Sequence, residues 1–168
     1  MSISMYQASV PVFTKMLTNL RVILEKTATH AQAKKIDEAV LIEARLFPDM
    51  LPFRRQVQIA TDQAKGAARL CGLEPPTHED KEQSLAELIN RVTRTIDYLG
   101  TLTPAQLDGS EDREIIRLVR GQSKTFKGMG FLLHFAMPNF YFHTTMAYAI
   151  LRHNGVELGK TDFLGSLD

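Results

Sequence analysis

Apolar residues recur at helical spacing in four segments of the chain. The first segment contributes one stripe of six residues: Phe13, Met16, Leu17, Leu20, Ile23 and Leu24. Positions three and four apart lie on the same face of a helix. The stripe therefore predicts a helix from about Met5 to Thr29. Pro11 falls within its first two turns, where a missing N–H costs least.

A second helix is predicted after the prolines at positions 48 and 52. Its apolar face is mostly alanine and consists of Val57, Ala60, Ala64, Ala67, Ala68 and Cys71. Gly72 supplies a C-cap, and Pro75 and Pro76 prevent the helix from continuing. Because alanine is small, a neighbouring helix can approach this face closely.

The third helix has the most regular pattern. Its apolar residues are Leu85, Leu88, Ile89, Val92, Ile96 and Leu99. The helical period then fails between positions 110 and 130, where two apolar runs flank a Gly121-Gln122-Ser123 turn. This arrangement predicts a short β-hairpin.

A fourth helix is predicted from about Gly130 to Asn154, with a kink or restart at Pro138. Residues 36–46 are expected to add a short helical connection. Together the segments predict an all-α fold, an antiparallel four-helix bundle with a short β-hairpin before the last helix. A chain of 168 residues has enough material for one core, so a single domain over residues 1–168 is expected.

Composition excludes several classes of protein. There are 20 Lys and Arg against 19 Asp and Glu, so the formal charge is +1 and no basic face for nucleic acid is indicated. No apolar run approaches the roughly 20 residues that span a bilayer, and no signal-peptide pattern is present. We therefore expect a cytoplasmic protein without nucleic-acid or membrane partners. Cys71 is the only cysteine, which excludes an internal disulfide.

The fourth helix carries the most distinctive polar residue, His143. Asn139 and His143 are four positions apart and share a face, which continues through the apolar residues Met146, Ala147 and Ile150. His143 is therefore predicted to point into the bundle, where an imidazole needs hydrogen-bond partners or a metal. Three interpretations stay open: a core histidine satisfied by a neighbouring helix, a metal ligand, or a general acid, base or substrate contact.

The second helix offers partners for His143 near its start. Gln56 and Gln63 flank the alanine face and could reach the interior, and Asp49 lies just before the helix. A buried carboxylate opposite His143 would orient the ring and shift the pKa values of both groups.

Motifs at both ends of this region resemble a known family. Residues 138–143 (Pro-Asn-Phe-Tyr-Phe-His), 148–155 (Tyr-Ala-Ile-Leu-Arg-His-Asn-Gly) and 159–165 (Gly-Lys-Thr-Asp-Phe-Leu-Gly) resemble the C-terminal signature of an uncharacterised bacterial family. Residues 48–60 resemble the start of the second helix in that family. The family, a domain of unknown function, is placed in the DinB/YfiT-like superfamily of four-helix bundles. The resemblance covers essentially the whole chain.

The resemblance implies a metal site and also its degeneration. Many DinB-like proteins hold a divalent metal with three histidines, one from the second helix and two from an H-x-x-x-H motif on the fourth. Some use the metal to activate a small thiol. His143 matches the second histidine of that motif, Asn139 replaces the first, and the second helix has no histidine. An amide oxygen is a poor ligand for zinc or nickel, which favour imidazole, carboxylate or thiolate.

A site that keeps one of the three metal-binding histidines is compatible with two functions. The first is a small-ligand-binding or non-catalytic bundle without a cofactor, whose degenerate site is lined by Asn139, Tyr141, His143 and Gln56. The alternative is a metal-dependent transferase or hydrolase that acts on a small molecule and holds a divalent ion, zinc or nickel, through His143 and Asp49. The aromatic residues of the fourth helix cannot all face one core, so a homodimer is expected in either case.

Overall fold

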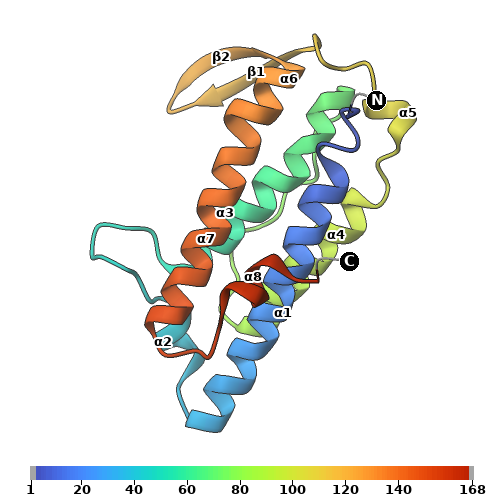
Figure 1. Ribbon diagram of the computed structural model, residues 1–168. Coiled ribbons are helices and arrows are strands. Elements are labelled where there is room, and N and C mark those ends of the chain that lie inside the picture. The colour runs from blue at the N-terminus through green and yellow to red at the C-terminus, as the bar shows by residue number, and fades with distance from the viewer. Residues whose placement is uncertain (1–2, 167–168) are drawn as a thin grey trace.

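The computed structural model describes residues 3–166 as a predominantly helical chain with one two-stranded sheet (Figure 1). Its longer helices are α1 (Val10–Lys34), α3 (Phe53–Lys65), α4 (Leu85–Leu99) and α7 (Met137–His153). Its shorter ones are α2 (Glu38–Ile42), η1 (Gly66–Cys71), α5 (Pro104–Leu107), α6 (Gly128–Phe131), η2 (Leu132–Ala136) and α8 (Lys160–Leu164). The strands β1 (Glu114–Val119) and β2 (Gln122–Lys127) form an antiparallel hairpin. The predicted helical class and the hairpin before the last long helix are confirmed.

The first helix lies further along the chain than its pattern predicts. It begins at Val10 rather than near Met5, because Pro11 occupies the first turn, where its missing N–H needs no partner. It continues beyond Thr29 until Lys35 adopts a left-handed φ of 54°. Both predicted ends were therefore wrong by several residues, while the buried stripe was right.

The last long helix continues directly from two shorter segments. α6, η2 and α7 follow one another without a break, and the backbone of η2 is wound with π rather than α geometry. Pro138 lies in the first turn of α7, directly after this segment. Asn139 donates from Nδ2 to the Phe135 carbonyl at 2.6 Å, so that carbonyl has a partner where the regular ladder is disturbed. The predicted interruption at the proline takes the form of this local change in winding.

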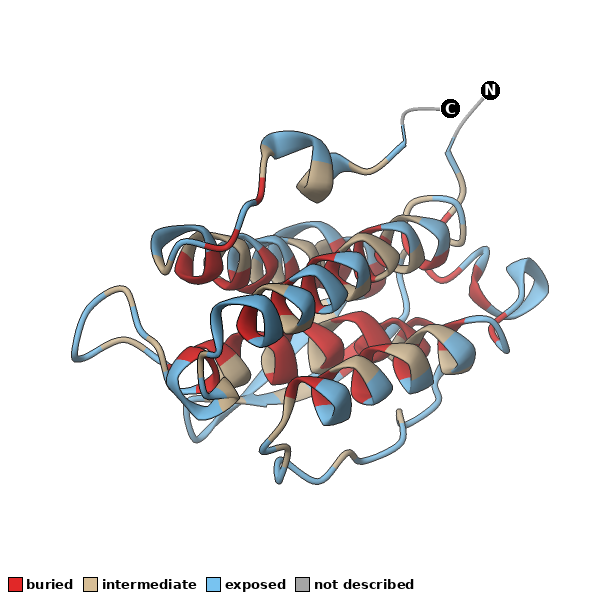
Figure 2. Cartoon of the chain, turned by 90° about the horizontal axis from the view of Figure 1, so that it is seen from below, coloured by how far each residue is buried: buried red, intermediate tan, exposed pale blue. Residues whose placement is uncertain are grey.

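The alanine-rich face of α3 packs closely against its neighbours. Ala60 and Ala64 are fully buried, and α3 contacts both α7 and α4, while α1 contacts α4. Phe13 of α1 meets Phe140 of α7 edge-on, with ring centroids 4.9 Å apart. Buried positions on the long helices face the interior between them (Figure 2). This core fixes α3 beside α7, which positions the candidate site.

The hairpin turns more tightly than expected. Arg120 and Gly121 form the turn with φ values of 50° and 77°, and Val119 pairs with Gln122. Two positive φ values in a two-residue loop are typical of a type I′ turn, whose twist matches that of the strands. The predicted turn at Gly121-Gln122-Ser123 lay too late, because Gln122 and Ser123 already belong to β2.

The C-terminal segment 159–165 docks α8 against α1 (Figure 1). Asn19 Nδ2 donates to the Phe163 carbonyl at 3.0 Å, and Lys26 Nζ pairs with Asp162 Oδ1 at 2.5 Å. Residues that carry the family resemblance therefore hold this segment onto the bundle.

Within residues 3–166, no helix combines the length and the apolar character needed to cross a bilayer.

Candidate functional site

A chain of hydrogen bonds joins α7 to the start of α3 through His143. His143 lies on the α3 side of α7 and is only 9% exposed. Its Nδ1 lies 2.8 Å from Oε1 of Gln56, and Nε2 of Gln56 donates to the carbonyl of Leu51 at 3.0 Å. His143 thus points into the bundle, and its partner there is Gln56, one of the residues that the sequence offered as possible partners.

The hydrogen-bond partners fix where the imidazole proton sits. The Leu51 carbonyl can only accept, so the amide nitrogen of Gln56 faces it and the amide oxygen faces His143. An amide oxygen also only accepts, so Nδ1 of His143 carries the proton and Nε2 carries the lone pair. Within the described residues, Nε2 makes no hydrogen bond.

The surroundings of His143 favour its neutral form. Burial lowers the pKa of His143 below its ordinary value of 6.5, and the positive charge of Arg55 lowers it further. Arg55 is itself fixed, because its guanidinium donates to Gln58 Oε1 at 2.7 Å and pairs with Asp80. The imidazole is therefore a neutral acceptor at pH 7, held in one orientation.

The other predicted site residues do not join this pair. Asn139 lies one turn before His143, but its amide donates to the Phe135 carbonyl of the preceding segment η2. Tyr141 is 37% exposed, and its ring packs on Phe140 at 5.6 Å. Asp49 lies exposed in the connection between α2 and α3 and makes no ion pair or hydrogen bond with His143. Of the residues predicted from sequence, the structure joins His143 and Gln56 directly.

The donor set around His143 does not fit a tightly held transition metal. Zinc and nickel sites in proteins use several imidazole, carboxylate or thiolate groups. In residues 3–166, no three or more such side chains converge to hold an ion. The neighbour of His143 is an amide, and that amide occupies Nδ1. The residues present supply one good ligand atom, Nε2.

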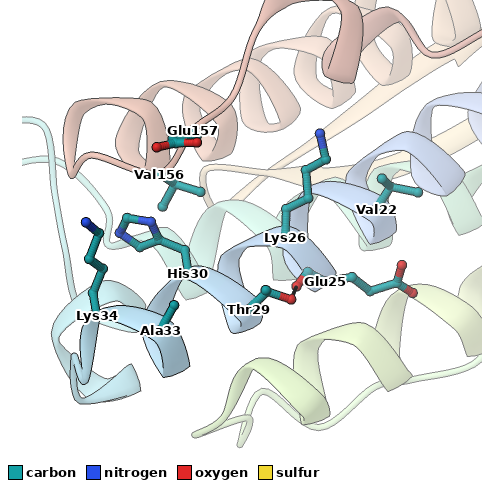
Figure 3. A pocket seen from close by; sticks show the side chains of 9 residues that line it. All are labelled: Val22, Glu25, Lys26, Thr29, His30, Ala33, Lys34, Val156 and Glu157. Atoms are coloured by element: carbon teal, nitrogen blue, oxygen red, sulfur yellow. Dashed lines mark hydrogen bonds between the residues drawn. The ribbon is translucent and has the colours of Figure 1, made fainter.

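One hollow of the structure lies away from His143. It is a groove of about 510 Å³ between the second half of α1 and the segment after α7. His30 and Lys34 point from α1 toward Val156 and Glu157 (Figure 3). The groove mixes charges of both signs, and the Nζ atom of its Lys26 is already paired with Asp162. Its size alone gives no indication of a ligand.

A buried arginine network on the other side of α3 was missed by the sequence analysis. Arg91 of α4 is 2% exposed, and its Nε donates to Thr61 Oγ1 at 2.7 Å. Its terminal nitrogens pair with Asp62 at 2.9 Å and with Asp80 and Glu82 at 3.0 Å. The network ties the connection between η1 and α4 to the bundle. Its only sequence signal was a charged residue beside the apolar stripe of the third predicted helix.

Known proteins resemble this chain in sequence and in structure. A family model described as "Domain of unknown function (DUF1993)" matches residues 5–164. The crystal structure of a DinB family member protein from Shewanella denitrificans is 44% identical, covers 96% of this chain and 92% of that chain, and superposes with a TM-score of 0.90. Comparison with curated proteins gave no match.

Proposed function

The chain belongs to the DinB-like family described as "Domain of unknown function (DUF1993)", and we propose that it is a four-helix bundle that binds a small molecule without catalysing its conversion. In this proposal, Nε2 of His143 accepts a hydrogen bond from the ligand. Gln56 keeps that acceptor in place. No cofactor takes part.

The single observation that carries the proposal is the hydrogen bond between His143 Nδ1 and Gln56 Oε1. A histidine whose only role is to pack in the core would not need an acceptor nitrogen that stays without a partner at the protein surface. Here the proton on Nδ1 faces Gln56 in the interior, and Nε2 has no partner and is not among the buried unpartnered nitrogens of the described residues. A ligand with a hydroxyl, an amide or an amine can donate a hydrogen bond to this nitrogen.

Apolar side chains near the ring indicate the rest of the ligand. Phe142 is 54% exposed and meets the His143 ring edge-on at a centroid distance of 5.1 Å. Leu51 is 44% exposed, and its carbonyl holds Gln56. The exposed ring of Phe142 beside a fixed polar acceptor suits a molecule with an apolar body and one donor.

The alternative of a metal-dependent transferase or hydrolase would use His143 and Asp49. The contact from Gln56 to Nδ1 resembles the way metal-binding imidazoles are oriented, but among the described residues no group of metal-binding side chains forms around Nε2. Zinc titration of protein freed of metal decides this. Stoichiometric binding in the micromolar range or tighter, lost in His143→Ala, would overturn the non-metal proposal.

Fragment screening by NMR tests the ligand itself. Small molecules that pair an apolar ring with an alcohol, amide or amine should shift the signals of His143 and Phe142 saturably. His143→Phe removes the acceptor and keeps the ring volume, so binding should weaken by about tenfold, the worth of one hydrogen bond to a fixed acceptor. Phe47→Ser serves as a control, since Phe47 is an exposed apolar residue without a contact to the His143 ring. Equal weakening in both variants, or no saturable shift, would contradict the proposal.

A further inference from the structure

A second, smaller hollow gathers three cationic side chains and a histidine from four parts of the chain. It has a volume of about 210 Å³, roughly that of seven water molecules in the liquid. Lys65 comes from the end of α3 and Arg69 from η1, while His78 comes from the connection to α4 and Arg117 from β1. Residues more than fifty positions apart in sequence thus line one small polar space.

Two nitrogen atoms at this hollow are buried without a partner. Nε of Arg117 and Nδ1 of His78 are inaccessible to solvent and make no hydrogen bond within the described residues. The Arg117 Nε–H can only donate, so it needs an acceptor. A buried donor without a partner costs free energy, and a bound acceptor would remove that cost.

The balance of charge at the hollow favours an anion. Asp62 is its only carboxylate, and Asp62 Oδ1 is already shared by Lys65 Nζ at 2.8 Å and by Arg91 Nη2 at 2.9 Å. Arg69 pairs with the exposed Glu74, and Arg117 forms no ion pair with any described residue. Positive charge therefore exceeds negative charge around the space.

The cations at the hollow also oppose one another. Burial lowers the pKa of Arg69, and the charge of Arg117 lowers it further. Burial lowers the pKa of His78 to about 4, with further lowering by Lys65, Arg91 and Arg94 and a smaller opposite effect from Asp62. An anion placed among these groups would relieve both effects.

The wall of the hollow is held in place before any ligand arrives. Pro75 and Pro76 restrict the backbone of the connection. Arg91 binds the Glu79 carbonyl at 3.3 Å and Glu82 Oε1 at 3.0 Å, which secures the same connection just beyond His78. Little ordering is left to take place on binding.

We propose that Lys65, Arg69, His78 and Arg117 form a binding site for the phosphate group of a small molecule. The space accommodates one tetrahedral oxyanion. Its oxygens accept from the Arg117 Nε–H and from the ammonium of Lys65, and guanidinium groups bind phosphate with paired donors. The site is independent of His143, because neither His143 nor Gln56 is among the other four residues that line it, which are Asp62, Pro75, Pro76 and Thr77.

Titration with two probes tests the site on the whole protein. Inorganic phosphate and glycerol 3-phosphate are added at constant ionic strength in chloride, and the His78 ring is followed by NMR. A saturable shift with either probe supports the site. Tighter binding of glycerol 3-phosphate identifies a phosphorylated metabolite as the ligand class, and equal or weaker binding identifies the free ion.

Variants distinguish a built site from general charge attraction. Arg117→Gln should weaken binding by about tenfold, as expected when a charge-assisted hydrogen bond is lost. Lys15→Gln removes one exposed charge on α1 and should leave binding unchanged. His78→Asn gives a second readout, by calorimetry, if Arg117→Gln does not fold. Shifts that fail to saturate, or equal weakening by Lys15→Gln, would overturn the proposal.

Discussion

At the scale of single residues, Arg91 is the most consequential side chain outside the candidate site. Its guanidinium has donors on all three nitrogens engaged with carboxylates, carbonyls and the Thr61 hydroxyl. Arg91 also affects the pKa values of its carboxylate partners. Burial alone would raise the pKa of Asp80 and that of Glu82, but hydrogen bonds and positive charge, with Arg91 among the sources, lower both.

Replacing Arg91 should destabilise the protein strongly. Arg91→Met keeps the apolar volume but leaves three carboxylates and the Thr61 hydroxyl without their common donor. We expect a loss of about 3 kcal/mol in the free energy of unfolding, the lower end for a broken buried pair because Asp62 and Asp80 are partly exposed. Urea denaturation measures this loss. Arg94→Met, at an exposed position of the same helix, should change stability by less than about 0.5 kcal/mol.

His78 should make stability depend on pH. The pKa of His78 in the folded protein is about 4, below the ordinary value of 6.5. Between these two pH values His78 therefore binds a proton in the unfolded chain but not in the folded chain. Stability should therefore fall as the pH drops from about 6.5 toward 4. In phosphate-free buffer, His78→Asn should lose less stability than the parent between pH 7.5 and pH 4.5, as measured by urea midpoints. An identical loss in both proteins would contradict the low pKa.

At the scale of elements, α8 depends on one glycine. Gly165 has a φ of 68°, and a Cβ atom there would lie 2.2 Å from Asn19 Oδ1. The same Asn19 holds the Phe163 carbonyl, so a side chain at position 165 both strains the backbone and displaces the docking contact.

Substituting this glycine should release α8 from α1. We expect Gly165→Ala to cost about 1–3 kcal/mol of stability and to increase hydrogen exchange in residues 159–165. Gly159→Ala is the matched control in the same motif, because a Cβ atom at Gly159 would meet Thr161 Oγ1 at an ordinary 3.7 Å. Equal effects from the two substitutions would contradict a specific role for Gly165.

Periodicity predicted the elements well where burial follows a helix face. The predicted stripe of the third helix and the buried face of α4 share Leu85, Leu88, Val92 and Leu99. Ile89 and Ile96 of the predicted stripe are only half-buried, and Arg91 and Thr95 are buried instead. Helix ends were less predictable, because the start of α1 depends on Pro11 and its end on the left-handed Lys35. The candidate site, too, was predictable only in part. Spacing alone predicted that His143 points inward, but it could not show that the amide of Asn139 binds the backbone of the preceding segment η2. The burial of Arg91 was not predicted, because a charged residue beside an apolar stripe usually faces solvent.

At the scale of the whole molecule, the expected homodimer stays a prediction. Phe140 is buried and Tyr148 packs on Phe163, whereas Tyr141 and Phe142 of the same helix are exposed. Two exposed aromatic residues on one long helix favour contact with a second copy. Light scattering should give twice the chain mass of 18.9 kDa, and Phe142→Ser should shift the protein toward the monomer. A mass of one chain at micromolar concentration would exclude the dimer.

The central claim is that His143 is neutral and that Gln56 keeps its proton on Nδ1 and its lone pair on Nε2. Long-range ¹H–¹⁵N NMR of the imidazole at pH 7 reads this directly. We predict a protonated Nδ1 and an unprotonated Nε2, and the loss of this preference in Gln56→Leu. A proton on Nε2, or on both nitrogens, would contradict the account.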